Sequence, residues 1–218
     1  MATRVYLEVG AKKVFACAID WPGWCRSGKT EDAALEALAA YAERYAPVVK
    51  RAKVRFPKSA GDSIEVVETL KGSPTTDFGA PDKACADDLK PLTKANAERL
   101  AALVQAAWDE LDAVARKTPA SLRKGPRGGG RDRDKMLGHV LGAEVAYARK
   151  IGPKLREPAL GDRAAIKANR VAILDVLKAA RSPEPDLTTK AWPYRYAARR
   201  IAWHALDHAW EMQDRSDP

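Results

Sequence analysis

Long apolar runs and paired cysteine motifs are missing from this 218-residue sequence. No stretch of 18 consecutive apolar residues is present, and the first residues lack the charged, apolar and small-residue blocks of a signal peptide. We therefore expect a soluble, cytoplasmic protein without a membrane segment. The three cysteines, Cys17, Cys25 and Cys85, are odd in number and contain no Cys-x-x-Cys spacing. This argues against a disulfide framework and against a thiolate zinc site, so we expect buried thiols.

Acidic residues are in the minority, with 29 Asp and Glu against 38 Lys and Arg and a net charge of +9. The charges nearly balance in residues 1–90, with 14 basic against 13 acidic, and the excess lies in residues 91–218, with 24 against 16. The basic residues are spread over several segments and are not interleaved with aromatic side chains, as nucleic-acid binders tend to require. We therefore do not expect a nucleic-acid partner. The charge instead favours solubility or the attraction of small anionic substrates.

The first 75 residues predict a small α+β domain with a ββαβ-like order. Residues 5–9 and 13–19 are rich in β-branched and aromatic side chains and predict two strands of a hairpin, and residues 63–70 predict a third strand. Thr30 is a helix N-cap, and apolar residues follow it at helical spacing, so we expect one helix that ends before Pro47. Gly, Pro and Asp in residues 76–90 predict a linker to the second half of the chain.

The hairpin, the turn after it and the start of the helix resemble the HicB-like antitoxin fold. The resemblance covers about 45 residues and implies a small interaction or packing domain, but the DNA-binding tail usual in such antitoxins is missing. The matching residues are Pro22, Gly23, Gly28, Thr30, Glu31, Ala33, Ala34 and Leu38.

Residues 91–218 predict four helices connected by three loops, which is the pattern of a four-helix bundle. Helix-compatible stretches cover about 91–117, 132–151, 161–181 and 193–214. The first and third of these have apolar residues along one side, as expected of helices that bury one face in a core.

All three histidines of the protein fall on faces that are predicted to point inward. His139 shares a helical face with apolar neighbours, and His204 and His208 are one turn apart on the last helix. A single inward histidine is usually a core residue with a hydrogen-bond partner. Three buried imidazoles are costly without partners, however, and one divalent cation would satisfy all of them. The pattern therefore favours a metal site formed by His139, His204 and His208.

Two segments around these histidines, 138–144 and 199–215, resemble the DinB-like superfamily of metal-binding four-helix bundles. That family places one histidine in the second helix and a His-x-x-x-His pair in the last, so the resemblance implies that His139, His204 and His208 are the metal ligands. Members include thiol-dependent transferases and isomerases, and also hydrolases. The implied cofactors are zinc, nickel or iron and a low-molecular-weight thiol such as mycothiol.

Further candidate residues surround the predicted site. Glu144 and Tyr147 follow His139 and are candidates for catalysis, while Arg127 and Arg131 precede it and are candidates for binding an anionic group of a cofactor or substrate. Asp207 and Glu211, beside the histidine pair, could orient an imidazole.

Three hypotheses for function stay open at this level. The first is an enzyme of thiol-transfer or hydrolytic chemistry that acts on a small molecule. The second is a non-catalytic metal-binding or stress-related protein that acts through a protein partner. The third is a regulatory module based on the HicB-like half. The metal, the substrate and the existence of a homodimer are not determined by the sequence.

Overall fold

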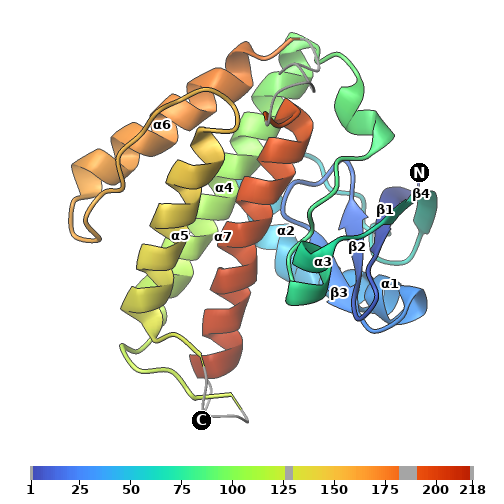
Figure 1. Ribbon diagram of the computed structural model, residues 1–218, viewed down its shortest axis with the longest axis horizontal. Coiled ribbons are helices and arrows are strands. Elements are labelled where there is room, and N and C mark those ends of the chain that lie inside the picture. Colours follow the sequence, from blue (N-terminus) through green and yellow to red (C-terminus); the bar gives the residue numbers. More distant parts are fainter. Residues whose placement is uncertain (1, 126–129, 182–190, 217–218) are drawn as a thin grey trace.

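An N-terminal sheet followed by long helices makes up the protein (Figure 1). The computed structural model describes residues 2–125, 130–181 and 191–216. This arrangement confirms the α+β prediction. The division into a HicB-like domain of residues 1–75 and a second domain of residues 91–218 stays a prediction, because one continuous hydrophobic core includes side chains from both ranges.

The sheet has four strands in the order β3-β2-β1-β4. Strand β1 (Thr3–Val9) pairs antiparallel with β2 (Val14–Ala18), which pairs antiparallel with β3 (Cys25–Gly28), while β4 (Ile64–Lys71) pairs parallel with β1. The alternation of side chains along β1 and β2 sends two sets of residues to opposite faces. Both sets are buried, so each face of the sheet centre is covered by other elements.

Strand β3 and the helical segment after it differ from the prediction. We expected residues 20–28 to form a turn, but the last four of them pair with β2, and so short a strand gives little periodic signal. The single predicted helix is two helices, α1 (Glu31–Ala40) and α2 (Ala42–Arg51), separated at Tyr41. The expectation that the helix ends before Pro47 was wrong. The helix is interrupted at Tyr41, and a second helix, α2, starts there and contains the proline.

Helix α1 covers one face of the sheet at very short range. A Cβ atom added to Gly28 would lie 2.5 Å from the backbone of Ala33 and Ala34, so only glycine allows this approach of strand and helix.

The predicted linker, residues 76–90, is part of a packed connecting segment, which we define as residues 72–90. It contains the short helix α3 (Pro74–Phe78) and the 3-10 turn η1 (Ala86–Leu89). The carboxylate of Glu8 is fully buried beneath it and accepts hydrogen bonds from the backbone N–H groups of Asp82 (2.8 Å) and Lys83 (2.9 Å) and from the hydroxyl group of Thr76. The segment is therefore fastened to β1 by specific polar contacts.

Helices occupy the four stretches predicted for the second half: α4 (Lys94–Lys117), α5 (Arg133–Ala148), α6 (Arg163–Ala179) and α7 (Tyr194–Ser216). In Figure 1, α4, α5 and α7 run side by side, and α6 crosses them obliquely. Helix α7 contacts α4 and α5, and α4 contacts α6. Their assignment to a DinB-like four-helix bundle stays a prediction. Within the described parts of the chain, no helix is both long enough and apolar enough to cross a membrane.

Candidate metal centre

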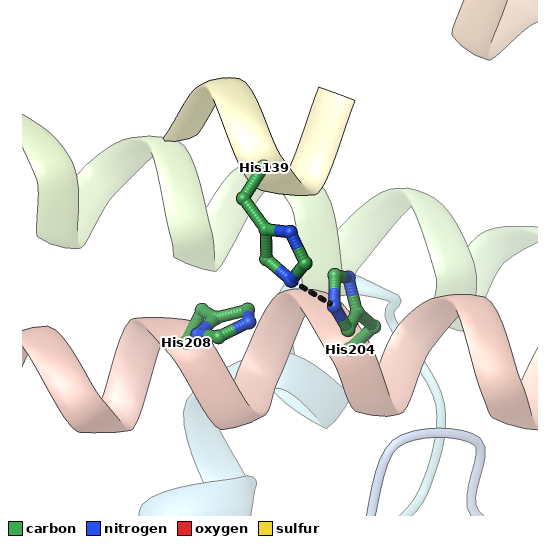
Figure 2. Close-up of side chains that lie close together, drawn as sticks. All are labelled: His139, His204 and His208. Carbon is green, nitrogen blue, oxygen red and sulfur yellow. Dashed lines mark hydrogen bonds between the residues drawn. The ribbon is translucent and has the colours of Figure 1, made fainter. Parts of the chain in front are cut away.

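The three histidines converge between α5 and α7. His139 extends from α5 toward His204 and His208, which lie one turn apart on α7 (Figure 2). The Nε2 atoms of His139 and His204 are 3.2 Å apart, and the three potential ligand nitrogens lie within 4.8 Å of one another. His204 and His208 are buried, with 7% and 8% of their surface exposed, and His139 is the most exposed of the three.

Helix α7 positions two of these side chains because its central part is covered by other elements. It packs against α4 and α5 and also reaches the sheet through Trp203, so its residues from Tyr196 to Ala205 are all buried except Arg200. The i, i+4 spacing then places the two imidazole rings 4.7 Å apart between their centroids. The ring of His139 lies 4.9 Å and 5.2 Å from those of His204 and His208.

The donor set fits a divalent transition-metal ion. Zinc binds imidazole nitrogen at about 2.0–2.1 Å, so two nitrogens on one edge of a tetrahedron lie about 3.3 Å apart. The 3.2 Å between His139 and His204 matches this edge. The ligand nitrogen of His208 lies within 4.8 Å of the other two, and three protein ligands leave a coordination position for a small molecule.

The environment favours neutral imidazoles, which are the form that binds a metal. Burial, together with the neighbouring His208 and His139, holds the pKa of His204 well below its ordinary value. Burial and the charge of Arg131 also lower the pKa of His139. Both rings therefore present a free lone pair at neutral pH.

A carboxylate on the next turn of α7 orients His208. Nδ1 of His208 donates a hydrogen bond of 2.9 Å to Glu211, whose other oxygen accepts one of 2.7 Å from Arg215. The hydrogen bond from His208, assisted by Arg215, holds the pKa of Glu211 below its ordinary value. With Nδ1 engaged in this way, Nε2 of His208 is the nitrogen left for a metal.

Asp207 has a different partner. Its carboxylate accepts a hydrogen bond of 2.9 Å from Arg26 on β3, which ties the sheet to α7 beside the histidines. The two residues line a polar cavity of about 280 Å³ with four residues of α7: Trp210, Glu211, Asp214 and Arg215. Glu211 therefore contacts His208 and also lines this cavity.

Glu144 lies in a buried ion-pair network between helices. It pairs with Arg170 of α6 at 3.2 Å, and Arg170 also pairs with Asp112 of α4 at 2.9 Å. Burial raises the pKa of Glu144 although the guanidinium opposes this. Its carboxylate accepts hydrogen bonds from Arg170, and none of the hydrogen bonds seen among the described residues joins it to a histidine. Sequence spacing alone could not identify Arg170, which lies 26 residues away on another helix.

Tyr147 lies beside the histidines, as its position on α5 predicts. Its ring is 5.7 Å from that of His204, and the Arg200 guanidinium lies 5.5 Å from the centre of the tyrosine ring. Arg131 is exposed, and its charge acts on the pKa of His139 and His204, so it lies near the same site. Arg127, the other predicted anion-binding residue, is outside the described residues.

No family model matches this chain, and neither a curated protein nor a solved structure matches it. The DinB-like and HicB-like resemblances therefore rest on the sequence motifs alone.

Proposed function

We propose that this protein is a metal-dependent, DinB-like enzyme in which His139, His204 and His208 bind one divalent cation and a small molecule reacts beside it. The observation that supports the proposal best is the convergence of three imidazoles, two of them with depressed pKa values, from two helices onto one point. Two of the three imidazoles are buried, and buried nitrogen donors are costly without a partner.

The class of reaction follows from the chemistry of the ligands. A divalent cation held by three neutral imidazoles keeps its full positive charge, and it would supply Lewis acidity toward an oxygen or sulfur atom of a bound molecule. This suits the activation of water for hydrolysis or of a low-molecular-weight thiol for transfer. We expect zinc, nickel or iron, since imidazole suits each of them.

The residues around the histidines have separate roles in this proposal. Glu211 orients His208 through its hydrogen bond, and the Tyr147 ring packs beside the ring of His204. Arg200 and Arg131 bring positive charge near the site, which favours a substrate that carries a carboxylate, phosphate or thiolate. Glu144, in its network with Arg170, stabilises the packing of α5 on α6.

Metal uptake by the full chain tests the proposal. Untagged protein is purified, its metal content is measured by elemental analysis, and zinc, nickel and iron(II) are titrated into chelator-treated protein. We expect about one ion per chain, and loss of binding in His204→Ala/His208→Ala. Gln213→Ala, an exposed change on the same helix, is the matched control. Circular dichroism establishes that each variant is folded.

The absence of any metal uptake by folded parent protein would contradict the proposed function. If metal binds, candidate thiols are screened against electrophiles, and ester or amide substrates are screened for hydrolysis. Turnover that depends on the metal supports the enzyme, whereas binding without turnover favours the non-catalytic metal-binding hypothesis.

A further inference from the structure

Two of the three cysteines face each other across neighbouring strands. Cys17 on β2 and Cys25 on β3 are direct partners in the antiparallel register, and their Sγ atoms are 2.7 Å apart. Both thiols are free and buried. The sulfur atoms are thus closer than an ordinary non-bonded contact and farther apart than the about 2.05 Å of a disulfide bond.

The backbone of the hairpin is suited to a bond between them. The next pair, Ala18 and Trp24, is joined by a hydrogen bond from the Ala18 N–H group to the Trp24 carbonyl oxygen (3.0 Å). Because hydrogen-bonded and non-hydrogen-bonded pairs alternate in antiparallel sheets, Cys17 and Cys25 form a non-hydrogen-bonded pair, with Cα atoms about 4.5 Å apart. That separation is within the about 4.4–6.8 Å range of disulfides, so a bond can close without moving the strands.

A small cavity lies against both sulfur atoms. Its volume is about 10 Å³, which leaves room for about one water-sized molecule, and its lining includes Cys17, Cys25, Arg199 and Trp203. Among the described residues, Nε of Arg199 and Nε1 of Trp203 are buried donors without a hydrogen-bond partner. Both donors belong to residues that line the cavity, which has room for about one water-sized molecule and is too small for a bulky one.

We propose that Cys17 and Cys25 are a redox-active dithiol, which hydrogen peroxide converts to a cross-strand disulfide inside the folded protein. One thiol loses its proton and attacks a peroxide oxygen as the thiolate, which breaks the O–O bond and forms a sulfenic acid, and the leaving hydroxide takes up that proton to give water. The second thiol attacks that sulfur, forms the S–S bond and releases a second water. Overall, two thiols and one peroxide give one disulfide and two waters, and the sulfur pair loses two electrons.

The burial of the pair determines how stable the product is. Burial, with the hydrogen-bonded contact to Cys17, raises the pKa of the Cys25 thiol well above its ordinary value. The reduced state therefore lacks the stabilised thiolate that makes strongly oxidising disulfides easy to reduce. Once formed, the bond is expected to resist mild reductants.

Mass spectrometry of peroxide-treated native protein tests the proposal. Fully reduced full-length protein is treated with hydrogen peroxide, quenched, denatured, alkylated and cleaved with trypsin. Cleavage after Lys13 and Arg26 leaves both cysteines in one peptide, residues 14–26, while Cys85 lies in the peptide of residues 84–94, because trypsin does not cleave between Lys90 and Pro91. We expect the first peptide to lose two hydrogens and to accept no alkyl group, with both thiols restored by a strong reductant. The Cys85 peptide is the internal control and stays alkylated.

Single variants and a second oxidant make the result specific. Cys25→Ser must abolish the loss of two hydrogens, and Cys85→Ser must retain it. Peroxide is expected to raise the unfolding temperature of the parent by roughly 5 °C and to leave that of Cys25→Ser unchanged. Ellman's reagent, a bulky aromatic disulfide, is expected to leave both thiols unmodified in native protein. Full alkylation of the 14–26 peptide after treatment, a disulfide between two chains, or sulfinic acid without a disulfide would each overturn the proposal.

Discussion

Arg199 on α7 forms a buried ion pair with Asp88, which lies 111 residues earlier in the connecting segment. The guanidinium Nη1 donates a hydrogen bond of 2.6 Å to the carboxylate, and both residues are almost completely enclosed. The metal-ligand candidate His204 follows Arg199 by five positions on the same helix. The pair therefore joins the segment that leaves the sheet to the helix that contributes two of the three histidines.

Removal of one partner of this pair is expected to be costly. Arg199→Met leaves the Asp88 carboxylate buried without its cation, which should lower the free energy of unfolding by about 3–5 kcal/mol and the unfolding temperature by roughly 10 °C. Urea denaturation measures the change. The double variant Arg199→Met/Asp88→Leu should recover much of the loss because no unpaired charge remains. A loss below about 1 kcal/mol in the single variant would show that the ion pair does not hold the segment in place.

Glu211→Gln is expected to weaken metal binding by about tenfold to a hundredfold. The carboxylate accepts the hydrogen bond from Nδ1 of His208, and the neutral amide holds that imidazole less firmly. Competition with a chromophoric chelator measures the affinity. Asp207→Asn is the matched control, because this neighbouring carboxylate pairs with Arg26. Equal losses in the two variants would indicate a general effect of charge and no orienting role for Glu211.

Glu144→Gln is expected to affect stability and leave the metal in place. The change weakens the pair with Arg170 and should lower the free energy of unfolding by about 2 kcal/mol. This value is within the range measured for hydrogen bonds to charged groups. Metal content and denaturation are measured on the same preparation. If an activity is found, a hundredfold loss of rate at unchanged stability would instead support the catalytic role that its place after His139 suggested.

Cys85 is expected to contribute to alkaline unfolding. Burial raises the pKa of its thiol to about 11, whereas the unfolded chain titrates near 9. Since the folded pKa is the higher one, the contribution is complete below about pH 9 and is lost as the pH rises to 11, for a total of about 2–3 kcal/mol. The slope of unfolding free energy against pH in this window should be shallower in Cys85→Ala than in the parent. Equal slopes would mean that the thiol ionises as readily in the folded protein as in the unfolded chain.

Periodicity was sufficient to predict the four helices of the second half and the convergence of the histidines. Residues four apart on a helix share a face whatever the rest of the fold, so the proximity of His204 and His208 could be inferred directly. His139 required only that its apolar neighbours face the core. The hydrogen bond from His208 to Glu211 also lies within one turn of α7. The spacing of the two residues was therefore enough to predict Glu211 as a candidate to orient an imidazole.

The contacts between distant segments were beyond the sequence patterns. Glu144 follows His139 closely, yet its partner is Arg170 on another helix. The connecting segment has the composition of a loose linker, but its backbone amides bind the buried Glu8 carboxylate. In both cases the partner is determined by tertiary packing, which no local pattern encodes. The pairing of Cys17 with Cys25 likewise required a strand, β3, that was too short to predict.

The position of Trp203 against the sheet has a consequence for synthesis on the ribosome. Phe15 and Arg26 leave the ribosome early, but the residues that they contact, Trp203 and Asp207, are on the last helix, and 181 residues separate Arg26 from its partner. Because chains emerge from the N-terminus, the part of the sheet that α7 covers stays exposed until this helix has been made. The nascent chain therefore exposes aromatic strand surface for most of its translation, and a chaperone that binds such surface would find its target in this interval.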